Sequence, residues 1–185
     1  THLLPVFRAA IAALAPAVPG LRVVLPTVPL VEPLVRAGLA GFPVPVDLLT
    51  TEADRYAAFD AADAALAASG TVTTELAVAG VPMVVAYKVS KLEEQLKYFI
   101  DVPSIVLPNL VLGENVIPEF LQDQCNPQTL SEALIPLLRG GQERLTQVAA
   151  LDRVEKAMRL PSGDEPSALA ARLSLATMDE RRARG

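Results

Sequence analysis

The sequence predicts an α/β fold in which helices cover both faces of a parallel sheet. Three observations predict this class. Short β-rich runs alternate with helical patterns over most of the chain. Residues 81–87 are apolar almost without interruption, which is typical of a strand buried on both faces. Hydrophobic residues make up 51% and charged residues 20% of the 185 residues, so the chain can form a domain with a real core.

The first part of the chain is predicted to alternate helices and strands. Phe7, Ile11 and Leu14 recur at helical spacing and indicate a first helix, which Pro16 ends. The same reading predicts further helices at residues 30–37, 56–62 and 71–79, and strands at residues 21–25, 44–48, 64–68 and 81–87. Alanine favours helices, so the assignment of residues 64–68 as a strand depends on context.

The second part is predicted to be mostly helical. Ser90 and Glu93 form a capping box that opens a helix, which Pro103 ends. Asn126 before Pro127 is a helix start, and Gly140 is the matching stop. The other expected elements are a strand at residues 104–107, a short helix at 117–122, a long helix at 143–159 and a last helix around 169–176. Residues 1–140 are therefore assigned to the α/β domain, and residues 141–185 to C-terminal helices and a charged tail.

Charge and rare residue types exclude several functions. The net charge of −5, without a basic block, argues against nucleic-acid binding. His2 is the single histidine, so neither a Ser-His-Asp or Cys-His set nor a zinc site of the usual spacing is available. Cys125 is the single cysteine, which excludes an internal disulfide. Arg8 and three prolines interrupt the apolar stretch at residues 3–21, so any membrane contact would be peripheral.

Polar residues follow the predicted strands where ligands bind in open α/β sheets, beyond the carboxyl ends. Ser69, Gly70 and Thr71 lie between a strand and a helix. Free amides and hydroxyls there can hold a diphosphate at the positive end of the helix, although a plain helix cap explains them equally well. Glu75, one turn later, can accept hydrogen bonds from ribose hydroxyls or simply be a favourable first-turn anion.

Two later loops carry weaker signals. Lys88 follows the strand at residues 81–87 and is either a phosphate contact or, more simply, a solvated lysine. Asn109 follows the expected strand at residues 104–107; its amide can read a uracil edge or a sugar hydroxyl, or cap its own turn. Glu119 and Gln122 are three residues apart and would share one face of the expected short helix.

Three segments together resemble the carboxyl-terminal half of lipid-A-disaccharide synthase, a glycosyltransferase family with the GT-B fold. The segments are SGTVTTELAVAGVPMVVAYKVS (residues 69–90), SIVLPNLVLGENVIPEFLQ (104–122) and PQTLSEALIPLLRG (127–140). The resemblance extends from residue 3 to about residue 160. It implies a Rossmann-like domain that is one half of a GT-B fold.

The resemblance also implies site residues. Ser69, Gly70 and Thr71 would lie at the diphosphate of a UDP-sugar, and Glu75 would bind its ribose. Asn109 would lie near the nucleotide or donor sugar, and Glu119 and Gln122 would help to shape that pocket. No metal and no cofactor are implied, because helix ends and fixed donors stabilise the UDP leaving group.

The implied reaction moves 2,3-diacylglucosamine from UDP-2,3-diacylglucosamine to 2,3-diacylglucosamine 1-phosphate (lipid X), giving the β-1,6 disaccharide and UDP. In the family, the amino-terminal half supplies a catalytic acid/base and much of the acceptor site. A glycine-serine-arginine loop and its strand would precede Leu3 in the family and are not in this sequence. We therefore expect a sheet without its first strand, no catalytic residue in this chain and no transferase activity from it alone.

Further expectations concern partners and alternatives. The family's last helices exchange between protomers, so a homodimer is expected, and the full enzyme is expected in the cytoplasm, peripheral to the inner membrane. Three alternatives stay open: another GT-B glycosyltransferase, half of a UDP-sugar 2-epimerase, and a non-catalytic nucleotide-binding module.

Overall fold

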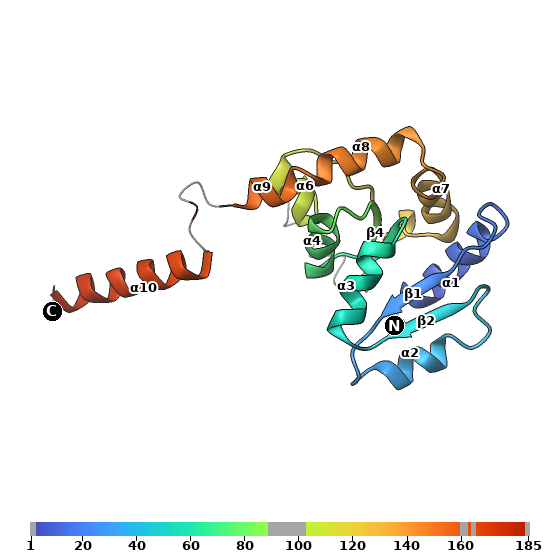
Figure 1. Ribbon diagram of the computed structural model, residues 1–185, viewed down its shortest axis with the longest axis horizontal. Helices are drawn as coiled ribbons and strands as arrows, with labels where there is room; N and C mark the ends of the chain where they lie inside the picture. The colour runs from blue at the N-terminus through green and yellow to red at the C-terminus, as the bar shows by residue number, and fades with distance from the viewer. Residues whose placement is uncertain (1–2, 89–102, 160–162, 164–165, 184–185) are drawn as a thin grey trace.

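A computed structural model describes residues 3–88, 103–159, 163 and 166–183, and Figure 1 shows its elements. The elements alternate as the sequence predicts up to β4 and are mostly helical afterwards. In chain order they are α1 (Leu3–Leu14), β1 (Val23–Pro26), α2 (Glu32–Gly38), β2 (Val46–Leu49), α3 (Glu52–Ala61), β3 (Ala65–Ala68), α4 (Thr71–Val78), β4 (Met83–Tyr87), α6 (Leu107–Leu112), β5 (Glu119–Leu121), the 3-10 helix η2 (Gln122–Gln124), α7 (Pro127–Leu138), α8 (Gln142–Leu151), α9 (Val154–Met158) and α10 (Pro166–Ala183). The helix expected to begin at Ser90 lies outside the described residues.

All described strand pairs are parallel, which confirms the predicted α/β class. β1 pairs with β2, and β3, β4 and β5 pair in that order. The strands thus form two sheets, since no hydrogen-bonded ladder joins β1 to β3 in the described part of the chain. The alanine-rich residues 65–68 do form a strand, in register with Met83 to Ala86 of β4. Pairing with β4 therefore outweighs the helical preference of alanine.

β4 is the middle strand of the three-stranded sheet and is covered on both faces, as its apolar sequence predicts. Met83 and Val85 pack into one core with α4, α6 and α9, whereas Val84 and Ala86 pack into a second core with α1 and α7. All four side chains have no solvent exposure. Successive residues of a strand point to opposite faces, so each core receives every second residue of β4.

Three predicted elements are wrong. Residues 104–107 are not a strand, because Pro108 stands in the first turn of α6, where proline is favoured, and the helix begins at Leu107. Residues 117–122 are not a helix, because Glu119–Leu121 pairs with β4 as strand β5. Residues 143–159 form two helices, since the chain turns at Asp152 and Arg153 between α8 and α9.

The buried side chain of Gln147 joins α8 to the sheet. It accepts a hydrogen bond from the Met83 amide and donates one to the Val116 carbonyl at 3.3 Å. Replacing Gln147 by leucine should lower the free energy of unfolding by about 2 to 4 kcal/mol, because both backbone groups lose their partner. Urea denaturation measures this loss, with Gln142→Leu as the control at an exposed position of the same helix. Equal effects of the two substitutions would show that the bridge contributes nothing.

Candidate functional site

A pocket of about 450 Å³ lies at the carboxyl end of β3. Five of its lining residues lie between the end of β3 and the second turn of α4, and the other two lie where the chain enters α6. The lining residues are Ser69, Gly70, Thr71, Thr74, Glu75, Ile105 and Leu107. Four of the seven predicted site residues therefore share one pocket. A larger hollow of about 1010 Å³ over β1 and β2 is lined mainly by apolar side chains and contains none of the predicted residues.

No side chain caps the start of α4. Gly70 is the N-cap residue and has φ 156° and ψ −167°, a conformation that is essentially confined to glycine. The Ser69 hydroxyl donates to the Ile105 carbonyl at 3.0 Å, and the Thr73 hydroxyl donates back to the Gly70 carbonyl at 2.7 Å. Ser69 is therefore not the helix cap that its position allowed. The first amides of α4 stay free of side-chain partners at the positive end of the helix.

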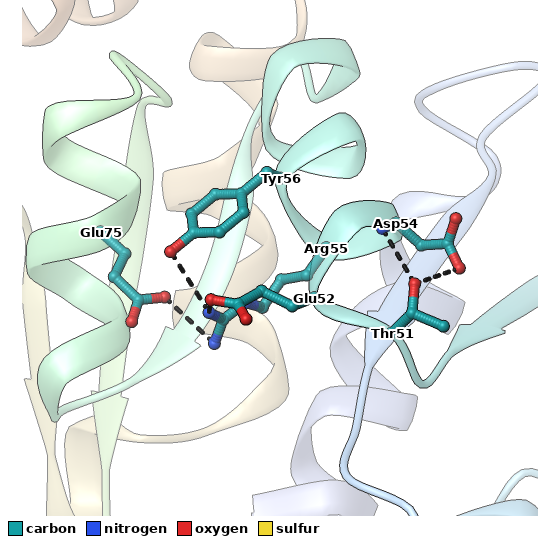
Figure 2. Close-up of polar contacts among 6 residues, drawn as sticks. All are labelled: Thr51, Glu52, Asp54, Arg55, Tyr56 and Glu75. Atoms are coloured by element: carbon teal, nitrogen blue, oxygen red, sulfur yellow. Dashed lines mark hydrogen bonds and ion pairs between the residues drawn. The ribbon is translucent and has the colours of Figure 1, made fainter.

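Two residues that line the pocket carry a buried polar atom without a hydrogen-bond partner, namely Thr74 Oγ1 and Glu75 Oε2. The third such atom among the described residues is Nε of Arg55. Most buried polar atoms in folded proteins are hydrogen-bonded, so such an atom at a pocket wall calls for a polar ligand or water. The Glu75 carboxylate does form an ion pair with Arg55 of α3, at 3.3 Å between Nη1 and Oε2 (Figure 2).

Asn109 lies behind the pocket rather than in it. Its side chain is 1% exposed and sits within α6, not directly after a strand. The amide donates to the Ile117 carbonyl at 2.9 Å and accepts from the Ile117 amide at 3.0 Å, so it does not cap its own turn. It also donates to Glu119 Oε1 at 3.2 Å, and Glu119 Oε2 accepts from the Ile105 amide at 2.9 Å.

These contacts connect the two predicted segments. Ser69 holds the carbonyl of Ile105, and Glu119 holds its amide. The loop after β3 and the α6–β5 segment therefore lie on the same side of the molecule. Glu119 and Gln122 do not share a helix face, since Glu119 is in strand β5 and Gln122 begins η2 with φ 49°. Gln122 follows β5 at the same carboxyl edge but does not line the pocket.

The sequence reasoning missed Arg55, Ile105 and Leu107 as neighbours of the site. Arg55 lies in α3, before β3, and nothing in the sequence distinguishes it from any other charged residue of a helix. Ile105 and Leu107 were assigned to a strand. Thr74 also lines the pocket and was not predicted, although its hydroxyl in the first turn after Gly70 is a signal that could have found it. No sequence signal identified the other three, because their place depends on how α3 and α6 pack against α4.

Cys125 is not a candidate nucleophile. Its side chain is 1% exposed and packs in the core beside α7. Burial raises the pKa of the Cys125 thiol, and the smaller opposing effect comes from the positive charge of Lys88. A buried thiol with a raised pKa is not ionised at neutral pH and behaves as a small apolar side chain.

Arg153 ties the α6–β5 loop to the C-terminal helices. It donates to both carboxylate oxygens of Glu114, at 2.9 and 2.8 Å. These hydrogen bonds, and then the charge of Arg153, hold the pKa of Glu114 below its ordinary value. Because the folded pKa is the lower one, the pair stabilises the fold above the ordinary glutamate pKa and loses this effect as the pH falls through the lowered value.

Replacing Arg153 by glutamine should raise the pKa of Glu114 toward its ordinary value. An NMR titration of the Glu114 side-chain carboxyl carbon measures this change. Arg159→Gln is the control, because Arg159 pairs with Glu155 instead. An unchanged Glu114 pKa in the Arg153 variant would contradict the assigned cause.

The part of the chain that the structure describes contains neither a candidate metal site nor a helix that could span a membrane. No three histidine, cysteine or acidic side chains of the described residues gather closely enough to hold a metal ion. None of the described helices combines the length and the hydropathy needed to cross a bilayer.

Comparison with known proteins places the chain in a family. The family model described as lipid-A-disaccharide synthetase matches residues 1–173. The lipid-A-disaccharide synthase of Bradyrhizobium diazoefficiens is 46% identical over 178 residues, which are 96% of this chain and 45% of that protein. The synthase of Nitrobacter winogradskyi is 44% identical over 184 residues (99% and 46%), and that of Rhodospirillum centenum is 42% identical over 167 residues (90% and 41%). The chain thus spans less than half the length of these relatives, and it belongs to the lipid-A-disaccharide synthetase family.

Proposed function

We propose that the pocket after β3 binds the uridine diphosphate of UDP-2,3-diacylglucosamine and that the chain is the donor-binding half of a lipid-A-disaccharide synthase. One observation carries the proposal: uncapped helix amides, a buried unpartnered hydroxyl and a carboxylate surround the same pocket. An anion and a diol are the ligand groups that such donors and acceptors complement.

The roles of the residues follow from their contacts. The diphosphate lies against Gly70 and Thr71, where the positive end of α4 stabilises negative charge on the UDP leaving group. Thr74 Oγ1 offers one more polar partner, and Glu75 accepts hydrogen bonds from the ribose hydroxyls. Ser69 acts by holding the Ile105 wall in place.

The residues behind the pocket have a supporting role in this proposal. Asn109 and Glu119 fix the backbone at Ile105 and Ile117 through buried and partly buried hydrogen bonds. Gln122 lies at the carboxyl end of β5. In this proposal the donor sugar extends from the diphosphate along that edge of the sheet. These three residues would set the shape of the donor pocket more than its charge.

The complete reaction needs more than this chain in our proposal. A second half of the enzyme supplies the acid/base and the acceptor site for lipid X, as the family resemblance implies. The 185 residues alone are then expected to bind UDP without transferring sugar. We also propose, from the same resemblance, a homodimer and a cytoplasmic enzyme peripheral to the inner membrane.

Calorimetry with UDP tests the binding proposal directly. The chain should bind UDP, and Glu75→Ala should weaken binding by about tenfold through loss of hydrogen bonds to the ribose. Glu143→Ala is the matched control, because Glu143 is also a carboxylate near the start of a helix but lies on α8. Absence of UDP binding, or equal affinities of the two variants, would refute the proposed pocket.

A donor assay separates the proposed reaction from its alternatives. A longer chain that includes the second half should consume UDP-2,3-diacylglucosamine and lipid X and release UDP. Turnover of an unacylated UDP-sugar instead would favour another GT-B enzyme or an epimerase. Transfer catalysed by the 185 residues alone would contradict the division of labour between the halves.

A further inference from the structure

Arg55 of α3 contacts Glu75, which lines the candidate pocket, but Arg55 is not itself a lining residue. Its guanidinium lies 3.3 Å from Glu75 Oε2 and 3.6 Å from Glu52 Oε1. Its Nη2 is 3.4 Å from the Tyr56 hydroxyl, and its Cζ lies 5.0 Å from the centroid of the Tyr56 ring. Figure 2 shows the guanidinium between the side chains of α3 and the carboxylate on α4.

These contacts restrict the guanidinium on several sides at once. Glu52 and Tyr56 belong to the same helix as Arg55. The guanidinium is therefore restrained by contacts within α3 in addition to its ion pair with Glu75. The side chains of Arg55 and Glu75 are each only 31% exposed, which limits their freedom further. A carboxylate on a flexible three-bond stem thereby obtains a fixed neighbour at the edge of the pocket.

The pair leaves hydrogen-bonding capacity unused. Arg55 Nε and Glu75 Oε2 are buried atoms without a hydrogen-bond partner, although the two groups attract each other as an ion pair. The interaction thus orients the carboxylate by charge and still leaves it able to accept hydrogen bonds. A partly exposed ion pair of this kind contributes little to folding stability. The main effect of the Arg55–Glu75 ion pair is to fix the position of the Glu75 carboxylate.

We propose that Arg55 is a positioning residue that holds the Glu75 carboxylate ready for the ribose hydroxyls of the nucleotide. The inference rests on the proposed UDP pocket. Arg55 need not touch the nucleotide, since it acts through Glu75. Without it, Glu75 must give up its side-chain freedom when the nucleotide binds, and UDP affinity falls by about three- to tenfold.

Sugar-modified nucleotides distinguish positioning from a general structural role. We compare the binding of UDP with that of 2′-deoxy-UDP and 3′-deoxy-UDP by calorimetry for the wild-type chain, Arg55→Gln, Arg55→Lys, Glu75→Gln and the Arg55→Gln/Glu75→Gln double variant. The wild-type chain should prefer UDP. Arg55→Gln and Glu75→Gln should both lose most of that preference, and the double variant should be no weaker than Glu75→Gln. Arg55→Lys should keep part of the preference because it retains the charge.

The controls separate this inference from the proposed function and from misfolding. Arg159→Gln removes an exposed arginine that pairs with Glu155 and should change neither affinity nor preference. Thermal unfolding of Arg55→Gln should stay close to wild type. If the wild-type chain does not bind UDP, the proposed function and this inference both fail. If it binds but Arg55→Gln keeps the full preference, or loses affinity equally for all three nucleotides, only the positioning role is refuted.

Discussion

Asn109→Leu is expected to lower the free energy of unfolding by about 2 to 5 kcal/mol, because it leaves the buried amide and carbonyl of Ile117 without partners. Leucine matches asparagine approximately in size, so the loss comes from hydrogen bonds rather than from a cavity. Glu119 also loses a donor, and the Ile105 amide that it holds becomes less restricted. Urea denaturation measures the loss of stability.

Asn115→Leu is the matched control for this prediction. Asn115 lies six residues later, in the same α6–β5 segment, but its side chain is exposed. Its replacement should change stability by less than about 0.5 kcal/mol, as for most surface positions. If the two variants unfold at the same urea concentration, the bonds of Asn109 to Ile117 do not hold this segment.

The Asn109 variant also bears on the binding site. Ile105 and Leu107 line the pocket, and Asn109 follows Leu107 in the first turn of α6. At temperatures where Asn109→Leu is still folded, UDP should bind more weakly because the wall at Ile105 has lost a support. Wild-type affinity in the folded variant would show that Asn109 and Glu119 have no influence on the pocket.

Gly70→Ala is expected to weaken UDP binding by at least tenfold and to destabilise the fold by about 1 to 3 kcal/mol, the usual cost of such a backbone conformation for a residue with a side chain. An added Cβ meets no protein atom within 4 Å. The new methyl group would instead stand in open space at the start of α4, where the diphosphate is proposed to lie. Both effects are measured on one protein, by calorimetry and by thermal unfolding.

Gly80→Ala provides the comparison that separates the two effects. Gly80 follows the other end of α4 and has φ 72°, so alanine is strained there as well, at about 1 kcal/mol. Its replacement should reduce stability without reducing UDP affinity. If Gly70→Ala loses stability but binds UDP as the wild type does, the diphosphate does not lie at the start of α4.

Local sequence signals determined much of this protein. The alternation of strand and helix patterns, the doubly buried β4 and the cap at Asn126 follow from periodicity, propensity and the special geometries of glycine and proline. The loop at residues 69–71 was found in the same way, because a glycine between a strand and a helix is a local feature. Asn126 Oδ1 does accept from the Thr129 amide, as an N-cap should.

Contacts between distant segments decided the rest. β5 is a strand because it pairs in parallel with β4. The residues from Ser104 to Val106 stay irregular because the Ile105 carbonyl and amide form hydrogen bonds with the side chains of Ser69 and Glu119. Strand pairing and buried hydrogen bonds join residues that are far apart in the sequence. Short-range sequence patterns therefore do not predict them. The position of Arg55 could not be predicted for the same reason, because its contact with Glu75 forms only when α3 and α4 pack together in the folded protein.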